Sequence, residues 1–259
     1  MRIEFLGLPG SGKTTIRRSL LSHLKKLDIE KYQTTEEAYY SRMKADGDKI
    51  YRYLLSVLPY KTGLKFSDWI HGRSLFQLEA QNEFLAMYGR SLSAFLQSVV
   101  FEKMSVKDKK NVMGNFLAMG SVWKLLDEDS FSNAMVFFEE GFIQKSFMFV
   151  DHSYSSNLIE EDLRMYLQNI PLPDIVIHVK TGVSLSHQRM LERKDGLTTR
   201  LKEADDGAID QFLHFADEHI SNVRNELAEQ SACQFIEVVN DGPLDDVVKT
   251  TINKLQCYF

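Results

Sequence analysis

The chain has 259 residues, of which 44% are hydrophobic and 26% charged, and its net charge is −5. This is the composition of an ordinary globular chain, and the acidic balance argues against a nucleic-acid-binding surface. The two cysteines, Cys233 and Cys257, are too few for a disulfide framework. No stretch approaches the roughly 18 apolar residues of a membrane span. We therefore expect a cytoplasmic protein with no nucleic-acid and no membrane partner.

The first stretch of the chain carries its most specific motif. Arg2 to Leu6 is a short apolar run that predicts a buried strand. The next residues, Gly7 to Thr14 (GLPGSGKT), match the phosphate-loop pattern G-x-x-x-x-G-K-[ST]. A helix is predicted directly afterwards, because apolar residues follow at helical spacing (Ile16, Leu20, Leu21, Leu24 and Leu27). The motif thus has the strand before it and the helix after it that the chemistry requires.

This loop predicts ATP and Mg²⁺ binding. Glycines let the backbone wrap closely around a phosphate, and the helix start adds unpaired N–H groups. We expect Lys13 to reach the β- and γ-phosphates and the Thr14 hydroxyl to ligate Mg²⁺. The predicted nucleotide-binding residues are Gly7, Pro9, Gly10, Ser11, Gly12, Lys13, Thr14 and Thr15.

A second short strand is predicted within Ile29 to Thr35. Glu36 and Glu37 then lie either at the ligand-binding end of that strand or in the first turn of the next helix. From Tyr39 to about Leu58 the pattern is helical, and Pro59 to Asp68 is predicted to be a loop.

Two long helices are predicted next. In the first, Leu78, Leu85, Leu92 and Val99 recur every seven residues, with Tyr88 and Phe95 between them, which indicates lengthwise packing on another helix. The second begins at the Ser105–Asp108 capping box and carries an apolar face (Val112, Phe116, Met119, Trp123 and Leu126). We interpret residues 39–130 as a helical insertion that binds an acceptor, acts as a lid or forms a dimer interface. Three of its basic residues could reach an acceptor or be solvated: Arg52, Arg73 and Arg90.

Two acidic residues follow a predicted buried strand. The strand is Asn133 to Phe138, and Glu139 and Glu140 come immediately after it. A carboxylate at this end of a strand, beside a phosphate loop, can bind Mg²⁺ through water or accept a hydroxyl proton. We predict both as catalytic candidates and Glu140, with Thr14, as the metal site. The alternative is an acidic surface turn.

Arginines follow the next strand, Pro171 to Lys180. A helix is predicted from Val183 to Lys194, with Arg189 and Arg193 on one face and Arg200 after it. Three arginines there could donate bidentate hydrogen bonds to a transferring phosphoryl group, or they could form a solvated helix end. His178, inside the strand, is predicted to be a packed core residue. Asp151-His152-Ser153 lacks the nucleophile elbow of a hydrolase triad.

The remaining elements are a helix, a strand and a closing helix. They are predicted at Asp205 to Gln230, Gln234 to Val239 and Leu244 to Leu255. Strands separated by helices imply one domain, residues 1–259, with a parallel sheet covered on both faces.

The chain resembles P-loop kinases of the nucleoside and nucleoside monophosphate kinase superfamily. The resemblance rests on GLPGSGKT, on VFFEEGF at Val136 to Phe142, on the segment from Asp174 to Arg200, and on FIEVVNDGPLDDVV at Phe235 to Val248. It implies an α/β, three-layer P-loop fold whose five-stranded parallel sheet has the order 2-3-1-4-5. It also implies that Glu140 replaces the family aspartate. Arg189, Arg193 and Arg200 would be lid arginines, and Asn240 and Gly242 would lie against adenine.

One departure from the family leaves the acceptor open. Ile143-Gln144 replaces the family Pro-Arg pair, which removes an arginine that grips the acceptor phosphate. The expected activity is therefore ATP- and Mg²⁺-dependent phosphoryl transfer to a small molecule: a nucleotide, a nucleoside or another hydroxyl compound. The alternative is a regulatory or scaffolding nucleotide-binding protein without turnover. The long helices could form a homodimer or an internal hairpin.

Overall fold

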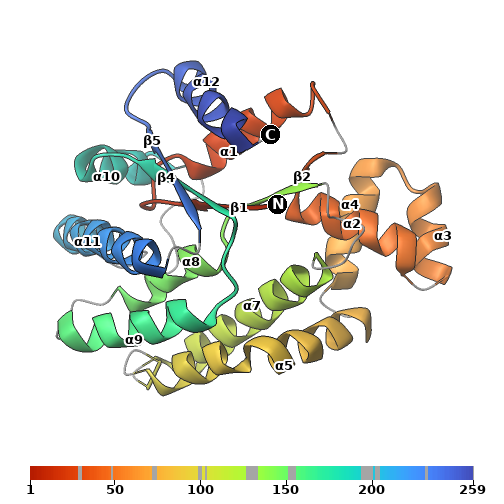
Figure 1. Cartoon of the computed structure of the whole chain (residues 1–259), viewed down its shortest axis with the longest axis horizontal. Coiled ribbons are helices and arrows are strands. Elements are labelled where there is room, and N and C mark those ends of the chain that lie inside the picture. Colours follow the sequence, from red (N-terminus) through yellow and green to blue (C-terminus); the bar gives the residue numbers. More distant parts are fainter. Residues whose placement is uncertain are drawn as a thin grey trace.

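The structure is a computed structural model. It describes residues 1–28, 31–47, 49–71, 75–98, 101, 102, 104–126, 134–150, 156–193, 201, 205–230 and 233–258. Figure 1 shows a central sheet with helices on both sides and a helical lobe at one end.

The central sheet has five parallel strands in the order β2-β3-β1-β4-β5. This confirms the predicted fold class and strand order. The three inner strands are short and largely buried because helices cover both faces of the sheet, whereas the two edge strands are partly exposed. In the central strand, Glu4 lies opposite Phe138 on one side and Val176 on the other. The strands are β1 (Arg2–Leu6), β2 (Tyr32–Thr34), β3 (Met135–Phe138), β4 (Ile175–Lys180) and β5 (Gln234–Val239).

Two hydrophobic cores separate the helices into layers. Ile3 and Phe5 belong to the core beneath α1 and α12, and Leu6 belongs to the larger core on the opposite face (Figure 1). Successive β1 side chains thus point to opposite faces. The first layer contains α1 (Lys13–Leu24) and α12 (Leu244–Leu255), which ends in a 3-10 turn (Gln256–Tyr258). The second contains α7 (Val106–Leu125), α8 (Phe142–Lys145) with the 3-10 turn Ser146–Phe149, α9 (Ser156–Asn169), α10 (Val183–Leu191) and α11 (Asp206–Gln230).

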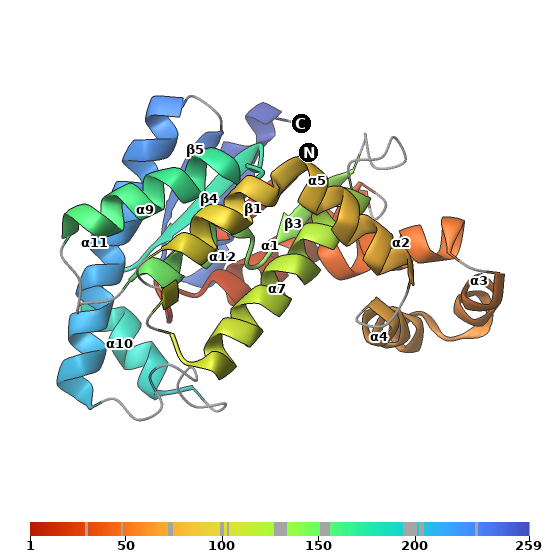
Figure 2. The same ribbon diagram turned by 90° about the horizontal axis from the view of Figure 1, so that it is seen from below.

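Helix α5 (Leu75–Gln97) packs against α7 and α9 of the same chain (Figure 2). The predicted seven-residue stripe on it is partly wrong, because Leu78 is 52% exposed. The contact instead centres on Phe84, which is fully buried and stacks on Phe142 at 5.5 Å. Tyr88 interrupts the helix with a non-helical backbone (φ −120°, ψ 17°), so a uniform repeat does not continue through it. The predicted core face of α7 is confirmed at Phe116.

Helices α2 (Thr35–Asp46), α3 (Lys49–Val57) and α4 (Tyr60–His71) form the lobe beside β2. Glu37 lies in the first turn of α2 and forms a capping box with Thr34, so the acidic pair begins a helix rather than ending a strand as a ligand. The predicted loop after Pro59 is wrong. The Pro59 carbonyl instead accepts the N–H groups of Thr62 and Gly63, which begins α4.

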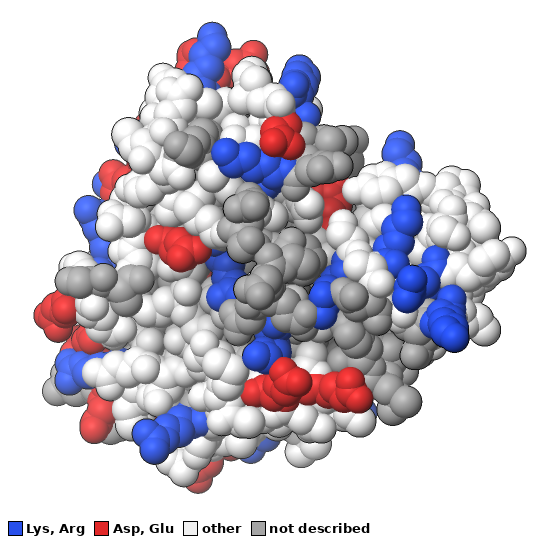
Figure 3. Space-filling view, turned by 45° about the vertical axis from the view of Figure 1, so that its right-hand side comes forward, with Lys and Arg blue, Asp and Glu red and all other residues white. Residues whose placement is uncertain are grey.

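This lobe lies at the end of the molecule opposite α10 in both ribbon views (Figures 1 and 2). Lysine and arginine side chains gather on it (Figure 3), and Lys44, Lys49 and Arg52 line a groove of 420 Å³ there. Among the residues that the structure describes, no helix is both long and apolar enough to cross a membrane.

Candidate active site

The phosphate loop turns sharply between β1 and α1. Gly10 and Gly12 have φ values of 85° and 90°, in the left-handed region that glycine adopts without strain. A side chain at Gly10 would also clash, since its Cβ would lie 2.3 Å from the Ser186 carbonyl oxygen. The Ser11 N–H donates to Leu8 O at 3.0 Å, which closes the turn. Pro9 lies on the same turn, half-buried.

The loop is braced from β4 and β5. Asn240 Nδ2 donates to the Ser11 carbonyl oxygen at 2.6 Å, and the Thr181 hydroxyl donates to the same oxygen at 3.2 Å. A Cβ on Gly12 would lie 2.4 Å from Asn240 Nδ2, so this glycine permits the contact. Gly242 lies in the exposed turn that follows. Asn240 therefore supports the loop, and its predicted contact with adenine stays a prediction.

Lys13 begins α1 and crosses the loop. Its Nζ donates to the carbonyl oxygens of Gly7 and Leu8 at 2.7 and 3.0 Å. Burial lowers the pKa of Lys13 to about 8, against the attraction of Glu140 and Glu139. At neutral pH the amine is still mainly protonated, as phosphate binding requires.

Glu139 follows β3 and contacts the first turns of α1. Its Oε1 accepts the Thr14 hydroxyl, and its Oε2 accepts a hydrogen bond from Arg17 Nη2. Thr14 and Arg17 are three residues apart on α1 and so share one face. Arg17 is a site residue that the sequence prediction missed. Its side chain is 8% exposed, whereas that of Glu139 is 35% exposed. Thr15, by contrast, is exposed.

Glu140 lies in a different environment. Its Oε2 accepts a hydrogen bond from Lys145 Nζ at 2.6 Å, and its side chain is 56% exposed. Burial opposes ionisation of Glu140, but the charges of Lys145, Lys13 and Arg193 outweigh it and lower the pKa. The structure thus places Glu139, rather than Glu140, against Thr14.

The predicted lid arginines that the structure describes lie in different environments. Arg189 Nη1 donates to the Asn240 carbonyl oxygen at 3.0 Å, so it would have to leave this contact to reach a phosphate. Arg193 is exposed, and its charge acts on both Lys13 and Glu140. Arg200 lies outside the described residues.

A buried carboxyl lies beneath the loop. Glu4 is fully buried in β1, and its Oε1 accepts the Gln144 N–H at 2.7 Å. Gln144 Oε1 in turn accepts the Gly7 N–H at 3.1 Å. Burial raises the pKa of Glu4 to about 7, although the N–H groups of α8 favour its ionised form. Gln144, which departs from the family pattern, therefore fixes the start of the loop.

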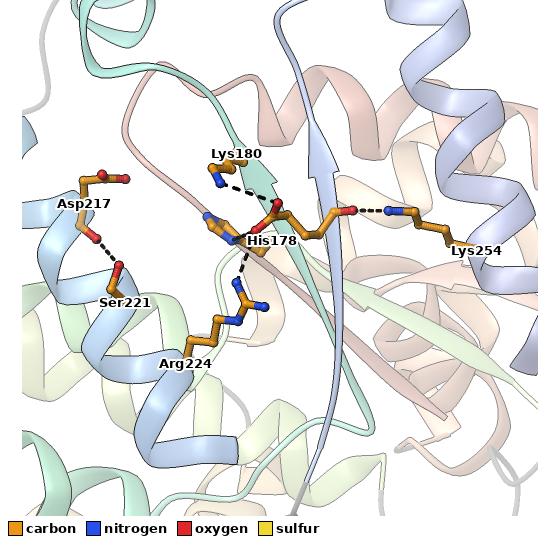
Figure 4. A network of polar contacts seen from close by, with 7 residues as sticks. His178, Lys180, Asp217, Ser221, Arg224 and Lys254 are labelled. Carbon is orange, nitrogen blue, oxygen red and sulfur yellow. Dashed lines mark hydrogen bonds and ion pairs between the residues drawn. The ribbon is translucent and has the colours of Figure 1, made fainter. Parts of the chain in front are cut away.

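His178 is a buried histidine at the edge of a polar network on β4 and β5. Its Nδ1 lies 3.8 Å from Oε2 of Glu237, which also pairs with Lys180 and Arg224 (Figure 4). Burial lowers the pKa of His178 and outweighs the charge of Glu237, which raises it. The network lies on α11, β4, β5 and α12, which carries Lys254 (Figure 4). His178 is buried, as expected of a packed core residue.

The other candidates lie elsewhere. Arg52 is on α3 in the lobe and Arg90 is exposed on α5. Arg73 and the Asp151–Ser153 segment lie outside the described residues. The sequence holds one signal for Arg17: it is a basic residue on the apolar side of α1, next to Ile16.

The donors at this edge of the sheet fit a nucleotide and a magnesium ion. Gly10 and Gly12 let the loop pack closely on Ser186 and Asn240, and the buried Ser11 hydroxyl has no hydrogen-bond partner among the described residues. Within those residues, no group of three or more His, Cys, Asp or Glu side chains could hold a metal alone. Mg²⁺ would have to share phosphate and water ligands with Thr14, which is its usual coordination in kinases.

Comparisons with known proteins show low sequence similarity throughout. No family model matches the sequence, and no curated protein matches it. Among solved structures, the chain is similar to deoxyadenosine kinase from M. mycoides with bound dCTP (13% identity, 99% and 100% of the two chains, TM-score 0.49). It is also similar to thymidylate kinase from Ehrlichia chaffeensis (12% identity, 99% and 98% of the two chains, TM-score 0.44).

The fold assignment rests on features of the chain itself. The sheet has the strand order β2-β3-β1-β4-β5, and the GLPGSGKT loop joins its central strand β1 to α1. Glu139 follows β3 directly, and the charge of Arg193, after α10, acts on Lys13 and Glu140 at that edge of the sheet. The chain therefore has a P-loop kinase-type α/β fold.

Proposed function

We propose that the protein is an ATP- and Mg²⁺-dependent phosphotransferase that moves the γ-phosphoryl group to a hydroxyl or phosphate oxygen of a small molecule, with a nucleoside or nucleotide as the first acceptor class to test. The observation that carries this proposal is the contact of Thr14 with Glu139 beside Lys13. It brings together, at one edge of the sheet, the three kinds of group that phosphoryl transfer uses: a hydroxyl that can bind the metal, a carboxylate, and an amine that can bind phosphate.

The loop would bind the β- and γ-phosphates through its N–H groups and the start of α1. Lys13 would exchange its bonds to the Gly7 and Leu8 carbonyls for bonds to phosphate oxygens. Thr14 would hold Mg²⁺, and the chemistry supplied by the metal when bound is neutralisation of charge on the phosphates.

The exposed carboxylate of Glu140 would orient the acceptor and take its proton. The acceptor oxygen then forms a bond to the γ-phosphorus as the bond to the β–γ bridging oxygen breaks, and ADP leaves. Arg193 would stabilise the equatorial oxygens, because its charge already acts on Lys13 and Glu140.

The test is incubation with ATP and Mg²⁺ and pooled nucleosides, nucleoside monophosphates and sugars, with ADP release and new phosphorylated masses as the readouts. A new product supports the proposal and names the acceptor class. Lys13→Ala should abolish transfer, because the variant lacks the positive charge that would neutralise the phosphates. Circular dichroism should show that its fold is intact. Retained turnover in Lys13→Ala would refute the assignment, and ADP release without a product would favour an ATPase.

A further inference from the structure

Arg17 is a buried cation with one ion-pair partner. Its side chain is 8% exposed, and among the described residues its only ion pair is with Glu139. Its Nε and Nη1 atoms are buried and have no hydrogen-bond partner in the described part of the chain. A buried charge whose partner is removed is strongly unfavourable, so the position of Glu139 is tied to that of Arg17.

Glu139 divides its two oxygens between two donors of one helix. Oε1 accepts the Thr14 hydroxyl and Oε2 accepts Arg17 Nη2. An arginine commonly grips both oxygens of one carboxylate in a fork. Here the carboxylate is shared instead, so its plane is fixed relative to the first turns of α1 and to the phosphate loop.

This arrangement constrains how Glu139 can meet a metal at Thr14. A direct bond to the metal would use an oxygen that already accepts a hydrogen bond from Thr14 or from Arg17, and a shift of the carboxylate onto the metal would break one of the two. Loss of the bond to Arg17 would leave the guanidinium buried and unpaired. Each oxygen keeps a second lone pair, however, and can still accept a hydrogen bond from metal-bound water.

We propose that Arg17 is a positioning residue that holds Glu139 against Thr14, so that this carboxylate serves Mg²⁺ through water rather than as a direct ligand. The proposal rests on the proposed function, since it concerns the metal that accompanies ATP. It separates the two acidic residues by role: Glu139 serves the metal, and Glu140, paired with Lys145, faces the acceptor.

The test compares ATP binding with and without Mg²⁺ by isothermal titration calorimetry. Arg17→Met should keep the metal-free ATP affinity within about twofold. It should lose about 10- to 100-fold of the gain in affinity that Mg²⁺ confers, as when an outer-shell partner of a metal site is removed. Arg17→Lys, which retains a charge, should recover part of that gain. The matched control is Arg18→Met, because Arg18 is the exposed neighbour on the same helix.

Mn²⁺ in place of Mg²⁺ gives a second readout that does not depend on turnover. Water-proton relaxation should show an about 10- to 100-fold weaker Mn²⁺–ATP complex in Arg17→Met than in the wild type, because the released carboxylate no longer holds the metal-bound water. An unchanged Mg²⁺ gain in Arg17→Met would overturn the proposal. The proposal would also be overturned if Arg17→Met and Arg17→Lys each lost as much ATP affinity without Mg²⁺ as with it. Arg17 would then support the phosphate loop itself. A wild type that binds no ATP in either condition would instead refute the proposed function.

Discussion

Glu4 provides a quantitative prediction, because it is a fully buried carboxyl in the central strand. Its pKa is raised from 4.5 to about 7, chiefly by burial. In the unfolded chain it ionises near its ordinary value, so between these two pKa values the folded state binds more protons. Stability therefore falls as pH rises from 4.5 to 7. Linkage puts the cost of Glu4 at about 1 kcal/mol at pH 5 and about 3 kcal/mol at pH 8.

Glu4→Gln removes this titration and keeps an oxygen that can accept the Gln144 N–H. Any fixed cost of the new amide cancels when the same pair of proteins is compared at two pH values. The free energy of unfolding of the variant relative to the wild type should rise by about 2–3 kcal/mol between pH 5 and pH 8. Urea unfolding at both pH values measures this, with the exposed Glu79→Gln as the control. An equal difference at the two pH values would show that Glu4 does not titrate as described.

The remaining predictions concern Lys13 and the packing of α7. Because the pKa of Lys13 is about 8, metal-free ATP affinity should fall about tenfold per pH unit above pH 8. Fluorescence titration of the protein with ATP at pH values from 7 to 9.5 measures this affinity. An affinity that does not change with pH would contradict the prediction. Gly120→Ala should destabilise the fold by about 1–3 kcal/mol, since its Cβ would lie 2.3 Å from Phe84 Cδ1. Gly114→Ala, in open space on the same helix, should instead gain about 0.5–1 kcal/mol. Thermal melts compare the two variants, and equal effects would place Gly120 outside the core.

Local patterns predict the sheet and its covering helices well. β5 and α12 have the predicted bounds, because Gly242 and Pro243 separate an apolar run from an amphipathic one. The phosphate loop is also predictable from local sequence, because the residues that form it are consecutive.

The α5 stripe is only partly confirmed: Tyr88 and Leu92 pack against the core but Leu78 is exposed, because periodicity alone does not identify which side meets the core. Phe84 faces the core because it stacks on Phe142, which comes from a distant part of the chain.

The site beyond the loop depends on partners that are far apart in the sequence. Arg17 contacts Glu139 across 122 positions, so its place on the apolar side of α1 predicts that it is buried but does not predict its partner. Both acidic residues after β3 were predicted as candidates. Their separation, with Glu139 on Thr14 and Glu140 on Lys145, depends on how the chain turns into α8.

The Asn240–Ser11 hydrogen bond joins residues 229 positions apart. During synthesis the phosphate loop leaves the ribosome well before its brace, which follows β5. Because β5 must pair with β4 before Asn240 can reach the loop, the nascent chain lacks this brace until β5 has emerged. The braced form of the loop is thus completed late in the folding of this sheet, long after the loop residues themselves have been made.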